Sequence, residues 1–272
     1  MKKFIETNKK LWNNWTKSHS SGSAEGYDLE SFKAGHGCLN KVELEELGDV
    51  KGKSLLHLQC HFGMDTLSWA QEGAIVTGVD LSDEAIRVAN ELSEELNIKP
   101  RFICSDIYDL PSKLDEKFDI VFTSYGVLPW LPDLNKWAEI VARYLKPGGT
   151  FYIVEFHPFI YMFTEDFTKL NQPYFYGKDP ICTMEVGSYA DRTGITQPAY
   201  EWPRPISEAV TALRKVGIIL DFMHEFPYSV HNCYPNLEEK NPGEYTVKGY
   251  PHPLPLMYSI KATYMPELAN NK

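Results

Sequence analysis

The feature that most constrains the fold is a regular alternation of short apolar strands with amphipathic helices, which begins at Ser54. Strands are predicted at residues 54–58, 75–79, 101–104, 118–122 and 150–155, with helices at 65–72, 83–96 and 133–144. This alternation is typical of a mostly parallel sheet with helices on both faces. Because the crossovers in such a sheet are right-handed, the carboxyl ends of these strands lie at one edge. The predicted class is therefore a doubly wound α/β fold.

The residues before this alternation are of a different kind. Aromatic and apolar residues at near-helical spacing predict an amphipathic helix from Phe4 to Trp15, and residues 40–47 suggest a short acidic helix. Residues 18–37 are rich in serine and glycine and lack a clear period, so we expect a mobile loop there. We interpret residues 1–49 as a helical cap, which either closes as a lid or packs against the sheet or a second copy.

The residues after the fifth strand also break the alternation. A stretch rich in Tyr, Phe and Pro at about residues 156–205 forms an insertion, which either walls an acceptor pocket or covers the sheet. A helix at 206–216 and strands at 218–226 and 256–264 then resume the pattern. Residues 50–272 are thus expected to form one main domain with this insertion.

Composition narrows the possible partners. The net charge of -10 and the lack of a dense Lys/Arg cluster disfavour nucleic acid. The five cysteines are widely spaced and form no C-x-x-C pair, which argues against a disulfide framework or a thiolate metal site. His224, His231 and His252 lack metal-ligand spacing. No signal or membrane segment is evident, so we expect a cytoplasmic protein. We also expect it to be a monomer or homodimer, and to act on a small molecule without a metal.

The turn after the first strand predicts a ligand. Residues 54–63 read SLLHLQCHFG, which keeps only the last glycine, Gly63, of a G-x-G-x-G pattern and has Gln59 and His61 at the other two positions. Asp80 ends the second strand, where a carboxylate can accept hydrogen bonds from ribose hydroxyls. Asp106 follows the third strand, where it can accept from an exocyclic amine. Each aspartate could instead cap a helix, but together they indicate a nucleoside.

The absence of the early glycines bears on the identity of that ligand. Dinucleotide-binding turns need glycine there because backbone amides must approach a pyrophosphate closely. Side chains at Gln59 and His61 would obstruct that approach. S-adenosylmethionine has no phosphate, and its amino-acid end tolerates bulkier residues.

Five segments in order resemble the motifs of class I S-adenosylmethionine-dependent methyltransferases: Leu55–Gly63, Gly78–Ser82, Ser105–Ile107, Phe118–Phe122 and Leu145–Thr150. The string HLQCHFG resembles, more narrowly, a group of bacterial small-molecule methyltransferase-like proteins. The resemblance implies a Rossmann-like, seven-stranded sheet with an antiparallel strand near the C-terminus. It also implies S-adenosylmethionine as the cofactor.

The resemblance further implies a set of cofactor contacts. The turn would lie against the methionine moiety, with Leu58, Gln59, Cys60, His61 and Gly63. Asp80 would hold the ribose and Leu81 would pack on the adenine, beside Ser105, Asp106 and Ile107. Ser124 and Tyr125 would flank the methyl donor. His57 stands where the family has an acidic residue, and it could equally be a core histidine.

Methyl transfer needs alignment of donor and acceptor, and a base where the acceptor has a high pKa. His157, at the end of the fifth strand, is the first candidate for a base, against the alternative of a structural turn histidine, and Tyr125 is the second. The predicted function is methylation of an oxygen or nitrogen atom of a small molecule. The alternatives are an NAD-dependent Rossmann oxidoreductase and an inactive protein that binds S-adenosylmethionine and has a regulatory role.

Overall fold

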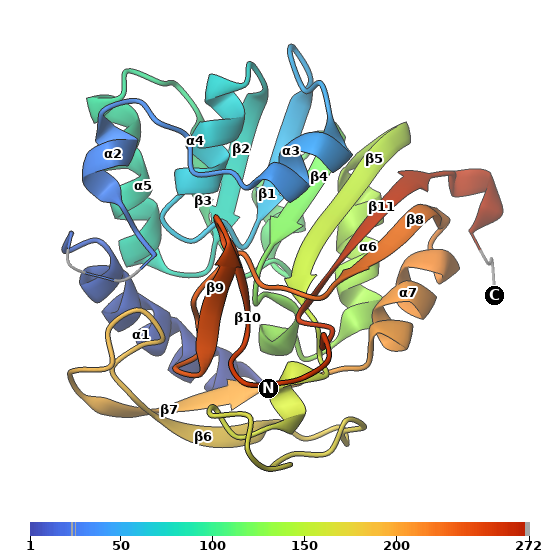
Figure 1. The fold of residues 1–272 in the computed structure, drawn as a ribbon. Coiled ribbons are helices and arrows are strands. Elements are labelled where there is room, and N and C mark those ends of the chain that lie inside the picture. The colour runs from blue at the N-terminus through green and yellow to red at the C-terminus, as the bar shows by residue number, and fades with distance from the viewer. Residues whose placement is uncertain (23, 25, 270–272) are drawn as a thin grey trace.

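A seven-stranded sheet forms the centre of the computed structural model, which describes residues 1–22, 24 and 26–269 (Figure 1). Its strand order is β3-β2-β1-β4-β5-β11-β8. The strands are β1 (Ser54–Leu58), β2 (Ile75–Asp80), β3 (Arg101–Cys104), β4 (Phe118–Ser124), β5 (Leu145–Phe156), β8 (Ile218–Phe226) and β11 (Met257–Tyr264). The first five strands are parallel, and β11 is antiparallel to both β5 and β8. This arrangement confirms the predicted doubly wound, mostly parallel fold.

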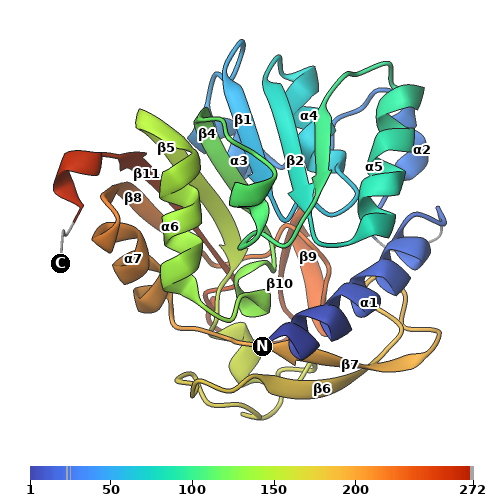
Figure 2. The same cartoon turned by 180° about the vertical axis from the view of Figure 1, so that it is seen from behind.

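Helices cover both faces of this sheet, as Figures 1 and 2 show. The helices of the alternating region are α3 (Lys41–Leu47), α4 (Met64–Gln71), α5 (Asp83–Glu95), α6 (Leu134–Tyr144) and α7 (Ile206–Lys215). Leu55 of β1 packs with α3 and α4 on one face, whereas Leu56 and Leu58 pack in the core that α6 and α7 cover. Because neither face of β1 meets solvent, the strand is a continuous apolar run rather than an alternating one.

Outside the sheet, one predicted helix is longer than expected and another helix was not predicted. Helix α1 runs over Lys2–His19, which includes the predicted helix from Phe4 to Trp15 and continues into the stretch predicted as a loop. Helix α2, at Leu29–Lys33, forms within that predicted loop. Residues 23 and 25 of that predicted loop lie outside the described residues. Asp28 caps α2 by accepting a 3.0 Å hydrogen bond from the amide of Ser31, which explains a helix without a long apolar period.

Two hairpins also lie in segments that lack a strong strand signal. Strands β6 (Ile181–Val186) and β7 (Thr196–Glu201) pair antiparallel within the insertion, and so do β9 (Leu237–Asn241) and β10 (Glu244–Val247). Helix α1 lies along β7 in both views (Figures 1 and 2). Short 3-10 turns complete the chain at Leu110–Ser112, Leu128–Trp130, Ile160–Met162 and Pro266–Leu268.

Within the described residues, no helix combines the length and the apolar character that crossing a bilayer requires. In the same part of the chain, no three His, Cys, Asp or Glu side chains gather in a way that could hold a metal ion.

Candidate cofactor site

The turn after β1 keeps a glycine-like backbone although two of its glycines are replaced. Gln59 and His61 have φ of 59° and 50°, in the left-handed region, and Gly63 has φ of 82°. A side chain costs about 1–2 kcal/mol in that conformation, so non-glycine residues that adopt it often mark a functional site. A Cβ on Gly63 would lie 2.7 Å from the ring of Phe102, which explains why this position must be glycine.

The backbone amides of this turn are used within the protein. The Cys60 amide donates to the carbonyl of Val79 at 2.9 Å, and the Gly63 amide donates to the carbonyl of Cys60 at 2.9 Å. The His61 amide donates to Oδ2 of Asp80 at 2.8 Å. These three amides are therefore not available to bind a pyrophosphate.

Asp80 and Asp106 lie at the ends of neighbouring strands. Asp80 pairs with Cys104 across β2 and β3, and its carbonyl accepts from the Ser105 amide at 2.8 Å. Burial raises the pKa of Asp80 to about 6, although amides that include those of Ser82 and His61 lower it. Burial also raises the pKa of Asp106, whose carboxylate accepts from the Tyr108 amide at 3.0 Å.

The remaining residues expected around the nucleoside lie beside these aspartates. Leu81 follows Asp80, and its carbonyl accepts a 3.6 Å contact from the thiol of Cys104. Ser105 is buried and donates to the carbonyl of Asp106 at 2.8 Å, and Ile107 is buried in the core. The fold thus brings together the predicted groups at the ends of β1, β2 and β3.

Ser124, the last residue of β4, and Tyr125, which follows it, lie beside two carboxyl groups that the sequence did not single out. The Ser124 hydroxyl donates to Asp65 at 3.0 Å, and the Tyr125 hydroxyl donates to Glu43 at 2.7 Å. Glu43 has no exposed surface, and burial, followed by the charge of Asp65, raises its pKa to about 7. Tyr125 also has a left-handed φ of 41°. Asp65 could have been suspected from its place just after Gly63, whereas Glu43 appeared to be only a helix residue.

His157 follows β5, the strand next to β4. Its Nε2 is 3.0 Å from Oε1 of Glu225 on β8, and its Nδ1 accepts from the Phe159 amide at 3.1 Å. Both ring nitrogens thus have partners within the protein, as expected for the alternative of a structural turn histidine.

His57, at the family's acidic position, is a core histidine. It is 2% exposed, and its Nδ1 lies 2.8 Å from the hydroxyl of Thr66. Burial lowers the pKa of His57 to about 3, so the ring is neutral at neutral pH. A neutral imidazole does not replace the negative charge of a carboxylate.

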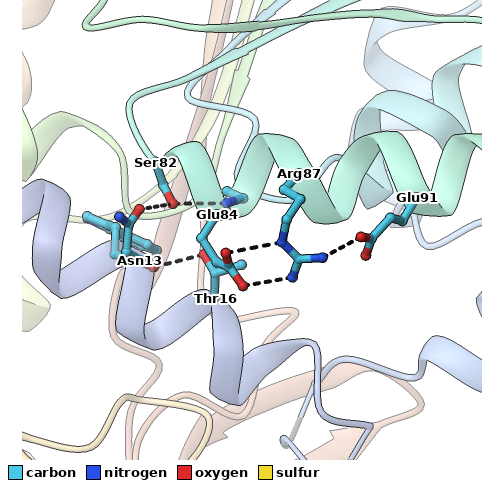
Figure 3. Close-up of polar contacts among 8 residues, drawn as sticks. Asn13, Thr16, Ser82, Glu84, Arg87 and Glu91 are labelled. Atoms are coloured by element: carbon cyan, nitrogen blue, oxygen red, sulfur yellow. Dashed lines mark hydrogen bonds and ion pairs between the residues drawn. The ribbon is translucent and has the colours of Figure 1, made fainter.

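Helix α1 covers the turn. The Trp12 ring lies 5.3 Å from the His61 ring and 5.2 Å from the Trp130 ring, measured between centroids. Nδ1 of His19 is 2.9 Å from Nε2 of His61. Figure 3 shows a polar contact between α1 and the start of α5. Ser82 donates to Oδ1 of Asn13 at 2.6 Å, and its hydroxyl accepts from the first turn of α5.

The side chains at the strand ends suit a ligand that is rich in hydrogen-bond donors. Asp80 and Asp106 are acceptors when ionised, and Oε1 of Gln59 is buried with no hydrogen-bond partner in the described part of the chain. Nδ1 of His61 is in the same situation. Ribose hydroxyls, an exocyclic amine and an ammonium group are such donors, so these residues fit S-adenosylmethionine.

The strand order and these acceptor groups define a class I, Rossmann-like methyltransferase domain. Residues 56–153 match the family described as "Methyltransferase domain". The family implies S-adenosylmethionine as the cofactor of the domain.

Relatives of known name agree with this family. The ubiquinone biosynthesis O-methyltransferase of Coxiella burnetii is 35% identical over 114 residues, which are 41% of this chain and 48% of the relative. The chain therefore spans about half the length of the curated relatives that it matches, including this one.

Solved structures agree in fold. A methyltransferase from Methanosarcina mazei has a TM-score of 0.56 at 21% identity, over 84% of this chain and 98% of its own. A methyltransferase from Clostridium acetobutylicum has a TM-score of 0.55 at 15% identity, over 83% of this chain and 88% of its own.

Proposed function

We propose that this protein transfers the methyl group of S-adenosylmethionine to an oxygen or nitrogen atom of a small molecule. The observation that carries the proposal is the juxtaposition of Asp80, Asp106 and the left-handed turn at the carboxyl ends of β1 to β3. The printed name of the Coxiella burnetii relative favours oxygen as the methylated atom. A reducing cytoplasm suits the five free cysteines.

Each residue group has a proposed role toward the cofactor. Asp80 receives the ribose hydroxyls, and Asp106, with Ser105, receives the adenine amine between Leu81 and Ile107. The turn from Leu58 to Gly63, with Cys60, lies along the methionine moiety, and Ser124 and Tyr125 lie at the methyl donor. When bound, the cofactor supplies a methyl carbon activated by the neighbouring sulfonium. The protein aligns the acceptor with it and excludes water.

We propose Tyr125 and Glu43 as the groups that remove the acceptor's proton. The acceptor hydroxyl gives its proton to the Tyr125 oxygen while the Tyr125 proton passes to Glu43 across their 2.7 Å hydrogen bond. A carboxylate with a pKa of about 7 is well matched to this work at neutral pH. His157 is not included in this mechanism because both of its ring nitrogens are engaged elsewhere.

We propose residues 1–49 as a lid over the cofactor and the insertion at about 156–205 as its support. Trp15 of α1 donates to the carbonyl of Gly187, and Asn8 exchanges hydrogen bonds with the backbone of Tyr200 at 2.7 and 2.9 Å. The insertion therefore holds α1 while α1 covers His61. A lid of this kind excludes water from the reacting atoms.

Two measurements test the proposed function. Calorimetry with S-adenosylhomocysteine should show binding, and labelled S-adenosylmethionine should transfer methyl to some member of a panel of phenols, hydroxy acids and amines. Tight NADH binding without S-adenosylhomocysteine binding would contradict the proposal in favour of an oxidoreductase. Demonstrated cofactor binding with no transfer across the panel would favour a regulatory binding protein.

A further inference from the structure

Glu155, at the end of β5, binds the loop that follows β4. The side chain is 2% exposed, and its carboxylate accepts hydrogen bonds from three consecutive loop amides. These are Gly126, Val127 at 2.8 Å and Leu128 at 3.0 Å. A fourth amide, that of Phe156, donates at 2.7 Å. Among the described residues, no Lys, Arg or His forms an ion pair with Glu155, so backbone amides alone compensate its charge.

This arrangement ties the loop to the sheet. Burial raises the pKa of Glu155, and the four amides lower it again. Moving the loop would leave a buried carboxylate without donors, which is strongly unfavourable. The backbone of residues 126–128 is therefore held in one position relative to β5.

The loop in turn orients Gln59. The Val127 carbonyl accepts a 3.1 Å hydrogen bond from the side-chain amide nitrogen of Gln59. Because a carbonyl can only accept, this contact identifies the nitrogen of the Gln59 amide and leaves its oxygen on the other side. That oxygen is buried and has no partner among the residues that the structure describes. A buried acceptor without a donor is unfavourable, and a donor on a ligand would relieve that cost.

We infer that Glu155 is a positioning residue for the cofactor: through the Val127 carbonyl it orients Gln59, whose side-chain oxygen accepts a hydrogen bond from the ammonium of S-adenosylmethionine. This inference rests on the proposed function. It explains how the site can bind the ammonium although position 57 carries the neutral His57 instead of a carboxylate. It also explains a glutamine in a left-handed backbone position that glycine would occupy at lower cost.

The test compares two ligands that differ only in the amino-acid end. S-adenosylhomocysteine carries the ammonium, whereas methylthioadenosine has the same nucleoside and thioether sulfur without the amino acid. Gln59→Gly removes the side chain without straining the backbone, and Glu155→Gln replaces one acceptor oxygen with an amide that cannot accept. Calorimetry should show that each variant binds S-adenosylhomocysteine about tenfold or more weakly than the wild type. The affinity of each variant for methylthioadenosine should equal that of the wild type. In the double variant, the affinity for S-adenosylhomocysteine should fall no further than in the weaker-binding of the two single variants.

Asp119→Asn provides the matched control. Asp119 accepts from the amide and hydroxyl of Ser54 and pairs with Lys146 at 2.8 Å, at the opposite edge of the sheet. This variant should lower the melting temperature while both affinities stay at the wild-type value.

Several outcomes would overturn the inference. Glu155 does not act through Gln59 if Glu155→Gln weakens the binding of both ligands equally. The same conclusion follows if the fold losses of S-adenosylhomocysteine affinity in the two single variants multiply in the double variant. Should Glu155→Gln not fold, unchanged S-adenosylhomocysteine affinity in Gln59→Gly would be sufficient to reject it. Failure of both ligands to bind the wild type would reject the proposed function itself.

Discussion

At the scale of single residues, Asp80 has a structural and a proposed binding role. Its carboxylate accepts the amides of His61 and Ser82, each at 2.8 Å, so it ties the turn to the start of α5. Asp80→Asn should weaken S-adenosylhomocysteine and methylthioadenosine alike, by about 1–3 kcal/mol, because both ligands carry the ribose. Calorimetry measures both, with Asp109→Ala, an exposed neighbour, as the control. Unchanged dissociation constants would remove Asp80 from the site.

Glu43 and Tyr125 lead to a prediction about pH. The base form of Glu43 is lost as pH falls through about 7, so kcat/KM should rise with pH through this value. The charged or polar groups near it include Asp65, Tyr125, Asn40, Cys38 and Tyr152, and none of these is a cation. Tyr125→Phe breaks the proton path and should lower turnover about a hundredfold, with cofactor affinity unchanged.

His157→Ala serves as the comparison for Tyr125→Phe, since the proposed mechanism does not use His157. Its turnover should remain close to the wild type. A large loss in His157→Ala, with Tyr125→Phe fully active, would reverse the assignment and return His157 to the role of base.

At the scale of elements, side chains on one face of α1 join it to the start of α5, beside the cofactor site. Lys9 pairs with Asp83 at 2.7 Å, and Asn13 accepts from Ser82, which neighbours the proposed ribose acceptor. Asn13→Ala should therefore raise the dissociation rate of S-adenosylhomocysteine severalfold, as measured by stopped-flow fluorescence. The substitution disturbs the core less than removing α1 would, because Leu11 and Trp15 of the helix are buried.

Thr7→Ala is the matched control on α1. Thr7 is half-buried, and its hydroxyl donates to the Lys3 carbonyl of its own helix at 2.9 Å. The dissociation rate of S-adenosylhomocysteine from Thr7→Ala should equal that from the wild type. Equal rates in Asn13→Ala and the wild type would leave α1 with a packing role alone.

At the scale of the whole molecule, two sets of buried titratable groups make stability depend on pH in opposite senses. Burial lowers the pKa of His19 and His57 to about 3 and that of His231 to about 4. The unfolded chain protonates them below about 6.5, so stability falls as pH decreases from there. Burial raises the pKa of Glu43 and Glu201 from 4.5 to about 7, so their contribution to stability is lost as pH rises from about 4.5 to about 7.

Above about pH 7 neither set of groups titrates further, so the melting temperature should level off there and fall toward acid pH. Circular dichroism between about pH 4.5 and 8.5 measures it. The gain in melting temperature of Glu201→Gln over the wild type should grow between about pH 4.5 and 7 and stay constant above about pH 7. Glu139→Gln, at an exposed position of α6, should show no such pH-dependent gain. A gain of Glu201→Gln that does not change with pH would contradict the prediction.

The sequence by itself determined the sheet and the list of groups at its carboxyl edge. The bounds of β1, β3 and β8 agree with prediction to the residue, because a short apolar run between turn residues is a local signal. Asp80 and Asp106 followed from the same signal, since each ends or follows a strand. The departures at Gln59 and His61 were visible as well, although their left-handed backbone was not.

Only the tertiary structure decided how the site is completed. Glu43 and Tyr125 are 82 positions apart, and Asn13 and Ser82 are 69 apart, so no local pattern announces their contacts. Glu155 shows the same limit, because its carboxylate binds the loop after β4, a contact between residues that are distant in the sequence. Local periodicity depends on neighbours in the chain, whereas a hydrogen bond between distant residues depends on which strands and helices the sheet brings together.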